Sequence, residues 1–278
     1  MENSKTVGKI VSYIILTLAF LIFVFPFFLI IVNSFKNNGQ ILESPFAMPK
    51  TFSLSHFGEA FNKMNFLVTF TNSLVITVCS VALILLFSSM TAYYLVRNNN
   101  RFSKIFFSIL VASMIIPFQS LMIPLIYIYG AKLNLIELMP RPLLIILYIG
   151  FGSALSVFMY HGFIKSIPAE LEEAALIDGC TRKQTFFKIV FPILKPTSMT
   201  IAILNVMWIW NDYLLPSLIL NKENLYTMPI KMKVFNGTYM NNWELLIPAL
   251  FLTILPILVF YFIGQKSIIK GVMQGSIK

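Results

Sequence analysis

Long apolar runs alternate with short polar segments along this chain of 278 residues. A helix that crosses the hydrocarbon core of a bilayer needs about 20 consecutive, mostly apolar residues. Six runs meet this requirement, at about 10–32, 69–96, 105–129, 143–163, 197–220 and 246–264. The pattern therefore predicts an all-α integral membrane protein whose six transmembrane helices form a single domain, 1–278.

The composition favours a membrane protein over a water-soluble one. Hydrophobic residues make up 58% of the chain and charged residues 12%, whereas a soluble domain has about 45–50% apolar and about 25% charged residues. The net charge of +10 does not indicate nucleic-acid binding, because no basic and aromatic module lies outside the apolar runs.

Lysine and arginine are unevenly distributed between two sets of polar segments. The two termini and the segments 97–104 and 164–196 carry 13 of them, and the other segments carry 8 of the 21. Cytoplasmic loops of membrane proteins are enriched in these residues. The distribution predicts that both termini, and the segments 97–104 and 164–196, lie in the cytoplasm.

The residues of segment 164–196 predict a helix, a turn and a second helix. Pro168 suits the first turn of a helix, and the three glutamates that follow are favourable near its N-terminus because of the helix dipole. Gly179 is a natural stop for this helix. Thr181 and Gln184 fit a capping box for the next helix, which we expect to end at Phe191-Pro192.

The first of these helices carries the small residues Ala174 and Ala175 side by side. Small side chains let another backbone approach closely, so this helix suits docking into a groove of a partner. The alternative is an amphipathic helix that rests on the bilayer. The acidic start argues against that alternative, because anionic lipid would repel it.

The same segment resembles the EAA loop of ABC-importer permeases. The family pattern is E-A-A, three residues, G, nine residues, then I-x-L-P. This chain has the same spacing, with Glu173-Ala174-Ala175, Gly179, Ile189 and Phe191-Pro192. Phenylalanine stands in place of the leucine of the pattern. The resemblance implies a coupling helix that sits in a cleft of an ATPase subunit. The residues to which it gives this role are Glu173, Ala174, Ala175, Asp178 and Gly179.

Further segments resemble the carbohydrate permeases of the maltose-permease type. Residues 210–216 read WNDYLLP, close to the W-N-[DE]-[FY]-L-x-P segment of that family, and the tail reads KGVMQGSIK. The resemblance is to the shorter, six-helix subunit of the pair, and it implies the type I importer fold and a prokaryotic cytoplasmic membrane.

The resemblance also implies a set of partners. They are a second permease subunit, a cytoplasmic ATPase dimer that binds ATP and Mg, an extracytoplasmic sugar-binding protein and a sugar substrate, for which the resemblance favours an oligosaccharide. It further implies that an outer loop contacts the binding protein and that the tail contacts the ATPase. The residues concerned are Asn236, Gly237, Thr238 and Tyr239 in the loop, and Gln274, Gly275 and Ser276 in the tail.

Polar and aromatic residues inside the predicted spans are candidates for the translocation path. Asp212 is the one acidic residue within a predicted span, and a charge at that depth usually faces a cavity or a partner. It either lines the path or fixes a break in its helix. The other candidates, which could equally bond neighbouring helices or pack, are Asn72, Gln119, Asn205, Trp208, Asn211 and Tyr213.

Sequence motifs for catalysis or nucleotide binding are absent. There is no G-x-x-x-x-G-K-[ST] and no H-E-x-x-H, and no Cys/His cluster has metal-ligand spacing. We therefore expect no cofactor in this chain, no metal site and no enzyme activity. The competing functions are an ion-coupled secondary carrier, which would have internal repeats and several buried ionisable groups, and, less strongly, a membrane-embedded enzyme.

Overall fold

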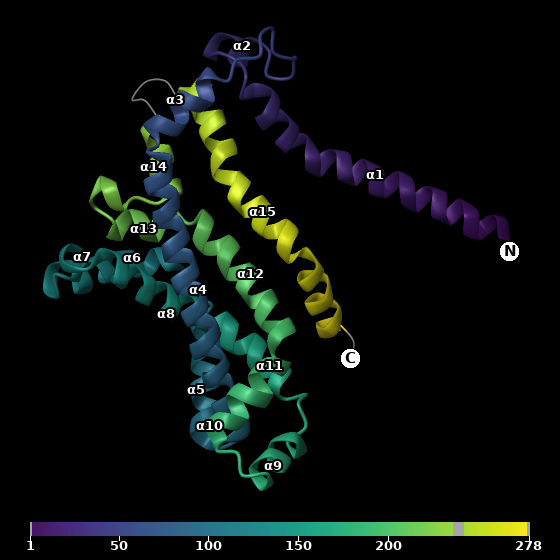
Figure 1. The fold of residues 1–278 in the computed structure, drawn as a ribbon, viewed down its shortest axis with the longest axis vertical. Helices are drawn as coiled ribbons and strands as arrows, with labels where there is room; N and C mark the ends of the chain where they lie inside the picture. Colours follow the sequence, from purple (N-terminus) through teal and green to yellow (C-terminus); the bar gives the residue numbers. More distant parts are fainter. Residues whose placement is uncertain (1, 236–241, 277–278) are drawn as a thin grey trace. The chain divides into compact units, whose positions relative to one another are not determined.

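The computed structural model describes residues 2–235 and 242–276, in which every regular element is a helix (Figure 1). The chain divides into two compact units. The first comprises Met1–Phe66 and Lys231–Pro256, and the second comprises Leu67–Ile230 and Ile257–Lys278. The all-α prediction is confirmed, and the one-domain prediction stays a prediction.

The first unit contains the N-terminal helix and the first part of the last one. Its elements are α1 (Glu2–Asn33), α2 (Asn38–Glu43), α3 (Ser55–Lys63), the 3₁₀ turn η4 (Met232–Phe235) and the first part of α15 (Trp243–Ser276). Within the described part of the chain, the apolar stretch of α1 from Gly8 to Asn33 has no buried residue in its most hydrophobic window. Its side chains are therefore available to lipid or to another subunit.

The second unit holds the remaining elements. They are α4 (Phe66–Arg97), α5 (Arg101–Ser113), α6 (Phe118–Leu125), the π-helix η1 (Ile126–Lys132), α7 (Leu135–Leu138), α8 (Pro140–Ile164), α9 (Glu170–Ile177), α10 (Arg182–Thr185), the π-helix η2 (Phe186–Val190), α11 (Phe191–Ile193), α12 (Lys195–Asn211), α13 (Leu214–Ile219), η3 (Glu223–Leu225) and α14 (Met228–Lys231).

Four helices match predicted spans, and two predicted spans are broken. The continuous ones are Gly8–Asn33, Phe66–Arg97, Pro140–Ile164 and Trp243–Phe262. The third span bends by 96° between Ser113 and Phe118. Pro117 there has an extended backbone and begins α6 without an N–H to continue the earlier helix.

The fifth predicted span, 197–220, differs from the structure at both ends. The chain stays helical through Pro192 instead of ending there, and the bend of 73° falls before Lys195, where Pro196 opens α12. At the other end α12 stops at Asn211, because Asp212 is extended and starts a separate short helix, α13. Pro117 and Pro124 indicate a kink in the third span and Asp212 is a candidate for the break in the fifth, but neither bend angle follows from the sequence.

A close approach of three helices forms the core of the second unit. At Gly152 in α8, a Cβ atom would lie 2.7 Å from Ile84 Cδ1 of α4 and 2.8 Å from Asn205 Oδ1 of α12. Both distances are shorter than Cβ contacts in proteins, so a larger residue here would require the Ile84 or Asn205 side chain to shift. Around this point the buried side chains of α4, α8 and α12 include Ile76, Leu144, Tyr148 and Ile209.

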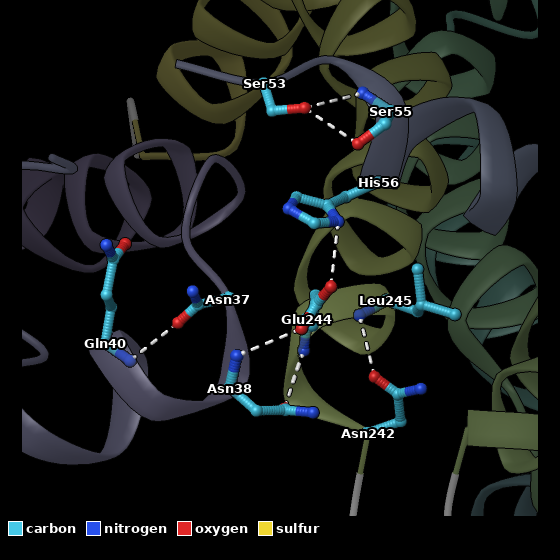
Figure 2. A network of polar contacts seen from close by, with 9 residues as sticks. All are labelled: Asn37, Asn38, Gln40, Ser53, Ser55, His56, Asn242, Glu244 and Leu245. Carbon is cyan, nitrogen blue, oxygen red and sulfur yellow. Dashed lines mark hydrogen bonds and ion pairs between the residues drawn. The ribbon is translucent and has the colours of Figure 1, made fainter. Parts of the chain in front are cut away.

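Polar contacts tie the short helices of the first unit to the start of α15 (Figure 2). Glu244 accepts a hydrogen bond from the backbone N–H of Asn38 at 3.1 Å, and the Asn38 side chain accepts one from the Glu244 N–H at 3.1 Å. The second oxygen of Glu244 lies 3.2 Å from His56 Nδ1. One carboxylate thus holds α2 and α3 against α15.

Lys36 closes the turn that follows α1. Its buried amino group donates to the side chain of Asn33 at 2.9 Å and to the carbonyl of Ser44 at 3.0 Å. Burial lowers the pKa of Lys36 below its usual range. The contacts satisfy carbonyl groups of the turn that follows the transmembrane helix.

Candidate functional site

The predicted helix–turn–helix is present in segment 164–196, which we call the coupling loop. Helix α9 begins at Glu170, two residues after Pro168, and its first turn carries three glutamates. It ends at Gly179, whose φ of +85° is a left-handed conformation that residues with a Cβ rarely adopt. The N–H groups of Gly179 and Cys180 donate to the carbonyls of Leu176 and Ala175 at 3.1 and 2.9 Å, which is a Schellman motif.

The second helix begins with the predicted capping box. Thr181 Oγ1 accepts a hydrogen bond from the backbone N–H of Gln184 at 3.3 Å, and Gln184 Oε1 accepts one from the Thr181 N–H at 2.8 Å. The two caps on either side of the turn fix where α9 ends and where α10 starts. The loop is therefore a defined structural element.

Helix α9 has one face toward its own chain and one face free. Ala175 is buried, whereas Glu173, Ala174 and Asp178 are exposed. The pair of small residues is thus divided between the two faces. The free face also carries apolar side chains, and Ile177 is 86% exposed. An exposed apolar and acidic helix face of this kind is suited to contact another protein.

The buried face of α9 is held by a charged cluster that the sequence reasoning missed. Glu172 Oε1 lies 2.6 Å from an Arg97 guanidinium nitrogen, and Arg97 Nε also donates to it at 2.7 Å. Tyr93 donates its hydroxyl hydrogen to the other oxygen of Glu172 at 2.7 Å, and Arg97 reaches the carbonyl of Ile167 at 3.0 Å. The cluster joins α9 to the end of α4.

No pattern in the sequence separates Glu172 from its neighbours. It is one of three glutamates in the first turn, which all fit the helix dipole equally well. Arg97 is one of several basic residues in the predicted cytoplasmic segments. Arg97 differs from the other basic residues in being the last residue of a long apolar run. That position indicates only that this end of the helix lies in the cytoplasm.

Four of the predicted path residues lie together at the break after α12. Asp212 accepts a hydrogen bond from Tyr148 of α8 at 3.0 Å through Oδ2, and from the N–H of Leu214 at 2.9 Å through Oδ1. Trp208 packs edge-on against the ring of Tyr148, with centroids 5.4 Å apart. The side chains of Trp208, Asn211 and Tyr213 are exposed within the chain. Asp212 therefore caps α13 beside an exposed polar and aromatic surface.

The other predicted path residues lie elsewhere and differ in exposure. Asn72 is buried, donates to the carbonyls of Asn224 and Tyr226 at 2.9 and 3.0 Å, and accepts from Arg141. Asn205 is buried and donates to the Ile201 carbonyl and to Ser156. These amides bond neighbouring elements, whereas Gln119 is exposed near the start of α6.

An apolar cavity of about 560 Å³ lies between the bent third span and α8. Its lining contains none of the predicted path residues. The side chains that surround it include Ser113, Phe118, Tyr129, Leu147, Phe151 and Leu155.

The residues predicted to contact the binding protein and the ATPase lie only partly within the part of the chain that the structure describes. The outer-loop residues Asn236, Gly237, Thr238 and Tyr239 lie outside the described residues. The backbone of Gln274, Gly275 and Ser276 belongs to the last turns of α15. Their proposed contacts stay predictions.

Comparison with known proteins gives the class of this chain. Residues 84–270, more than half of the chain, match the model of the family described as binding-protein-dependent transport system inner membrane component. The chain belongs to this family. It is therefore a multi-pass membrane subunit of an ABC importer, a permease and not an enzyme, and α9 carries the EAA loop of the family.

Relatives match over nearly the whole chain. A probable starch degradation products transport system permease protein, AmyC of Thermoanaerobacterium thermosulfurigenes, is 42% identical and 93% of each chain is covered. The multiple sugar-binding transport system permease protein MsmG of Streptococcus mutans is 35% identical with 100% of each chain covered. The melibiose/raffinose/stachyose import permease protein MelC of Bacillus subtilis is 35% identical with 91% of each covered.

A solved structure shares the fold. It is a chain of a bacterial ABC transporter involved in the import of the acidic polysaccharide alginate, with a TM-score of 0.72 and 23% identity. The alignment covers 95% of this chain and 97% of the other. The predicted importer-permease fold is thus confirmed, with four to six membrane-spanning helices.

Proposed function

We propose that this chain forms half of the translocation pathway of an ATP-driven importer for oligosaccharides. The observation that carries the mechanism is the contact of Glu172 with Arg97 and Tyr93, since it connects the exposed coupling helix to a full-length transmembrane helix. The substrate class rests on the relatives, whose names refer to starch degradation products and to melibiose, raffinose and stachyose.

The partners follow from the permease class. A second permease subunit completes the pathway, a cytoplasmic ATPase dimer binds ATP and Mg, and an extracytoplasmic binding protein delivers the sugar. Both termini lie in the cytoplasm, as the distribution of basic residues predicts. The residues 236–239 contact the binding protein, and 274–276 contact the ATPase.

The coupling loop is the proposed ATPase contact. Glu173, Ala174 and Asp178 are exposed and make the direct contact, while Ala175 lets α9 lie close to its own chain and Gly179 fixes the end of the helix. Closure of the ATPase dimer moves α9 as a rigid body, and the pathway changes from inward-facing to outward-facing. The loaded binding protein stabilises the outward-facing state by binding it more tightly.

The pathway surface proposed for sugar is the break after α12. Trp208 and Tyr213 present aromatic rings, and Asn211 and Asp212 present hydrogen-bonding groups beside them. A sugar has apolar C–H faces that stack on aromatic rings and hydroxyl groups that bond amides and carboxylates. Asn72, Gln119 and Asn205 remain further candidates, of which the buried Asn72 and Asn205 would need their internal hydrogen bonds to open.

The test is reconstitution of the complex that co-purifies with the tagged chain from native membranes. Proteoliposomes that contain it should take up labelled oligosaccharide only with internal ATP and the external binding protein, and an ionophore should have no effect. Deletion of 173–179 should abolish uptake and leave membrane insertion intact. ATP-independent, ionophore-sensitive uptake would contradict the proposal and favour the ion-coupled carrier.

A further inference from the structure

A polar cavity of about 400 Å³ lies where α5 begins, beside the ends of α4 and α8. It is separate from the surface after α12, and of the coupling loop it includes Lys165 alone. The polar residues in its lining are Asn99, Ser103, Lys104, Ser108, His161 and Lys165. The predicted orientation places this cavity at the cytoplasmic surface of the membrane.

The charge of the cavity is positive. Lys104 and Lys165 line it, and no acidic side chain does. Within the described residues, the ion pairs involve other side chains, so neither lysine is neutralised by a carboxylate. Two lysines without counter-charges at a membrane surface attract an anion.

Ser103 offers the cavity a hydrogen-bonding group without a partner. The residue is 2% exposed, and its hydroxyl has no hydrogen-bond partner. The other serines of the same helix do not share this state, because Ser108 and Ser113 donate to the carbonyls of Lys104 and Leu110 at 2.9 and 2.6 Å. A buried polar group is normally paired, so this hydroxyl is free to donate a hydrogen bond to a group bound in the cavity.

The position of Ser103 on α5 favours an anionic ligand. It lies in the first turn of this 13-residue helix, where the helix dipole favours negative charge, although its own N–H donates to the Asn100 side chain at 2.8 Å. The rings of Phe107 and His161 stack with centroids 3.8 Å apart and fix the adjoining wall. The cavity therefore combines two cations and a free hydroxyl.

An apolar groove continues from this cavity along α5. The groove has a volume of about 400 Å³ and is lined by Lys104, Ile105, Ser108, Ile109 and Ala112. It shares Lys104 and Ser108 with the polar cavity, so the two spaces adjoin. A ligand that fits both has an anionic head and an apolar tail.

We propose that this composite site binds an anionic phospholipid of the cytoplasmic leaflet. Its phosphate lies between Lys104 and Lys165 and accepts a hydrogen bond from Ser103, and one acyl chain lies in the groove along Ile105 and Ile109. A bound lipid here contacts α5 and α8 together. It thus stabilises the start of α5 at Arg101. This residue follows Arg97, the last residue of α4 and the ion-pair partner of Glu172 in α9, by four positions.

Native mass spectrometry of the purified importer complex tests the site, with phosphatidylglycerol and phosphatidylcholine as probes. The intact complex should retain phosphatidylglycerol in preference to phosphatidylcholine. Each lysine near a membrane surface contributes about a fivefold preference for anionic lipid, so the double variant K104Q/K165Q should lose most of it. The matched control is Lys195→Gln, which removes an exposed charge at the start of α12, away from the cavity.

One further variant and one competition experiment test the hydroxyl and the groove separately. Ser103→Ala removes only the unpartnered hydroxyl, so the complex should assemble normally and retain severalfold less phosphatidylglycerol. Inorganic phosphate in millimolar excess should not displace the lipid, because it cannot occupy the groove. Equal retention by the wild type and both variants would overturn the proposal, as would displacement by phosphate alone. These readouts do not depend on transport, so they are independent of the proposed sugar specificity.

Discussion

Arg97 at the end of α4 and Glu172 in α9 are separated by 75 residues and form an ion pair with an N–O distance of 2.6 Å. The Glu172 side chain is 9% exposed and that of Arg97 is 22% exposed. Tyr93, one turn earlier on α4, donates to the same carboxylate. A force on the coupling helix therefore reaches α4 through a charged and largely buried contact.

Replacement of Glu172 by glutamine should uncouple ATP hydrolysis from transport. The amide is nearly isosteric, but it leaves the Arg97 charge without a counter-ion, and loss of one partner of a buried ion pair costs about 3–5 kcal/mol. The partial exposure of Arg97 places the expected cost at the lower end. The number of sugars imported per ATP hydrolysed, measured in proteoliposomes, should fall severalfold.

Two variants control for a general effect of charge on α9. Glu170→Gln removes an exposed glutamate from the same turn and should leave the ratio unchanged. The exchange of the two charges, Arg97→Glu with Glu172→Arg, should recover part of the coupling that either single change loses. An unchanged ratio in Glu172→Gln would show that the contact with α4 does not transmit the movement.

Gly179→Ala should weaken the coupling loop by about 1–2 kcal/mol. The residue has a φ of +85°, and an L-residue with a Cβ is strained in that conformation. Its surroundings are open, so the effect comes from the backbone and not from a clash. Hydrogen exchange of residues 170–185 should accelerate in the variant. Asparagine at the same position should be milder, because it tolerates a positive φ better.

The control for this change is Gly162→Ala in α8. Gly162 also has open space around it, but it lies in a regular helix where alanine is preferred by about 1 kcal/mol. This variant should therefore leave the exchange of the coupling loop unchanged. Equal exchange in both variants would contradict the importance of the left-handed turn.

The helix ends in the coupling loop were predictable because a helix stop or cap depends on residues only a few positions apart. The N–H groups of Gly179 and Cys180 donate to carbonyls three and five positions back, and Thr181 and Gln184 cap each other directly. The six apolar runs were predictable for a similar reason, since hydrophobicity is a property of each run alone. Such signals do not depend on how distant parts of the chain pack.

The contacts that position the site were not predictable from the sequence, because they join residues far apart in the chain. Tyr148 is 64 residues from Asp212, and Glu172 differs from its neighbouring glutamates only in what it touches. A proline inside an apolar run indicates a kink, as Pro117 does in the third span, but not its angle of 96°. These contacts and bend angles depend on tertiary packing, which cannot be derived directly from a single sequence.

Gly152→Ala should destabilise the importer, because the added methyl group overlaps Ile84 and Asn205. Overpacking of a tight core costs about 1–3 kcal/mol, and here it displaces the Ile84 and Asn205 side chains, of which Asn205 is held by hydrogen bonds to Ile201 and Ser156. The apparent melting temperature of the purified complex should fall by several degrees. Gly150→Ala, two residues away in the same helix and with nothing within 4 Å of its Cβ, should not lower it. A drop of equal size in both variants would contradict the close approach at Gly152.

Substitutions of Asp212 separate its two possible roles, as a lining group of the pathway and as a cap of α13. Asp212→Asn keeps an oxygen for the N–H of Leu214 and removes the charge, whereas Asp212→Ala removes the cap as well. Loss of a helix cap costs about 1 kcal/mol, so only the alanine variant should lose stability.

If Asp212 also contacts sugar, the asparagine variant should raise the KM for uptake at unchanged stability. Tyr148→Phe, which removes the hydroxyl that bonds Oδ2, should affect KM in the same direction because it frees the carboxylate to move. Unaltered KM in both variants, together with lower stability in Asp212→Ala, would assign Asp212 to the cap alone.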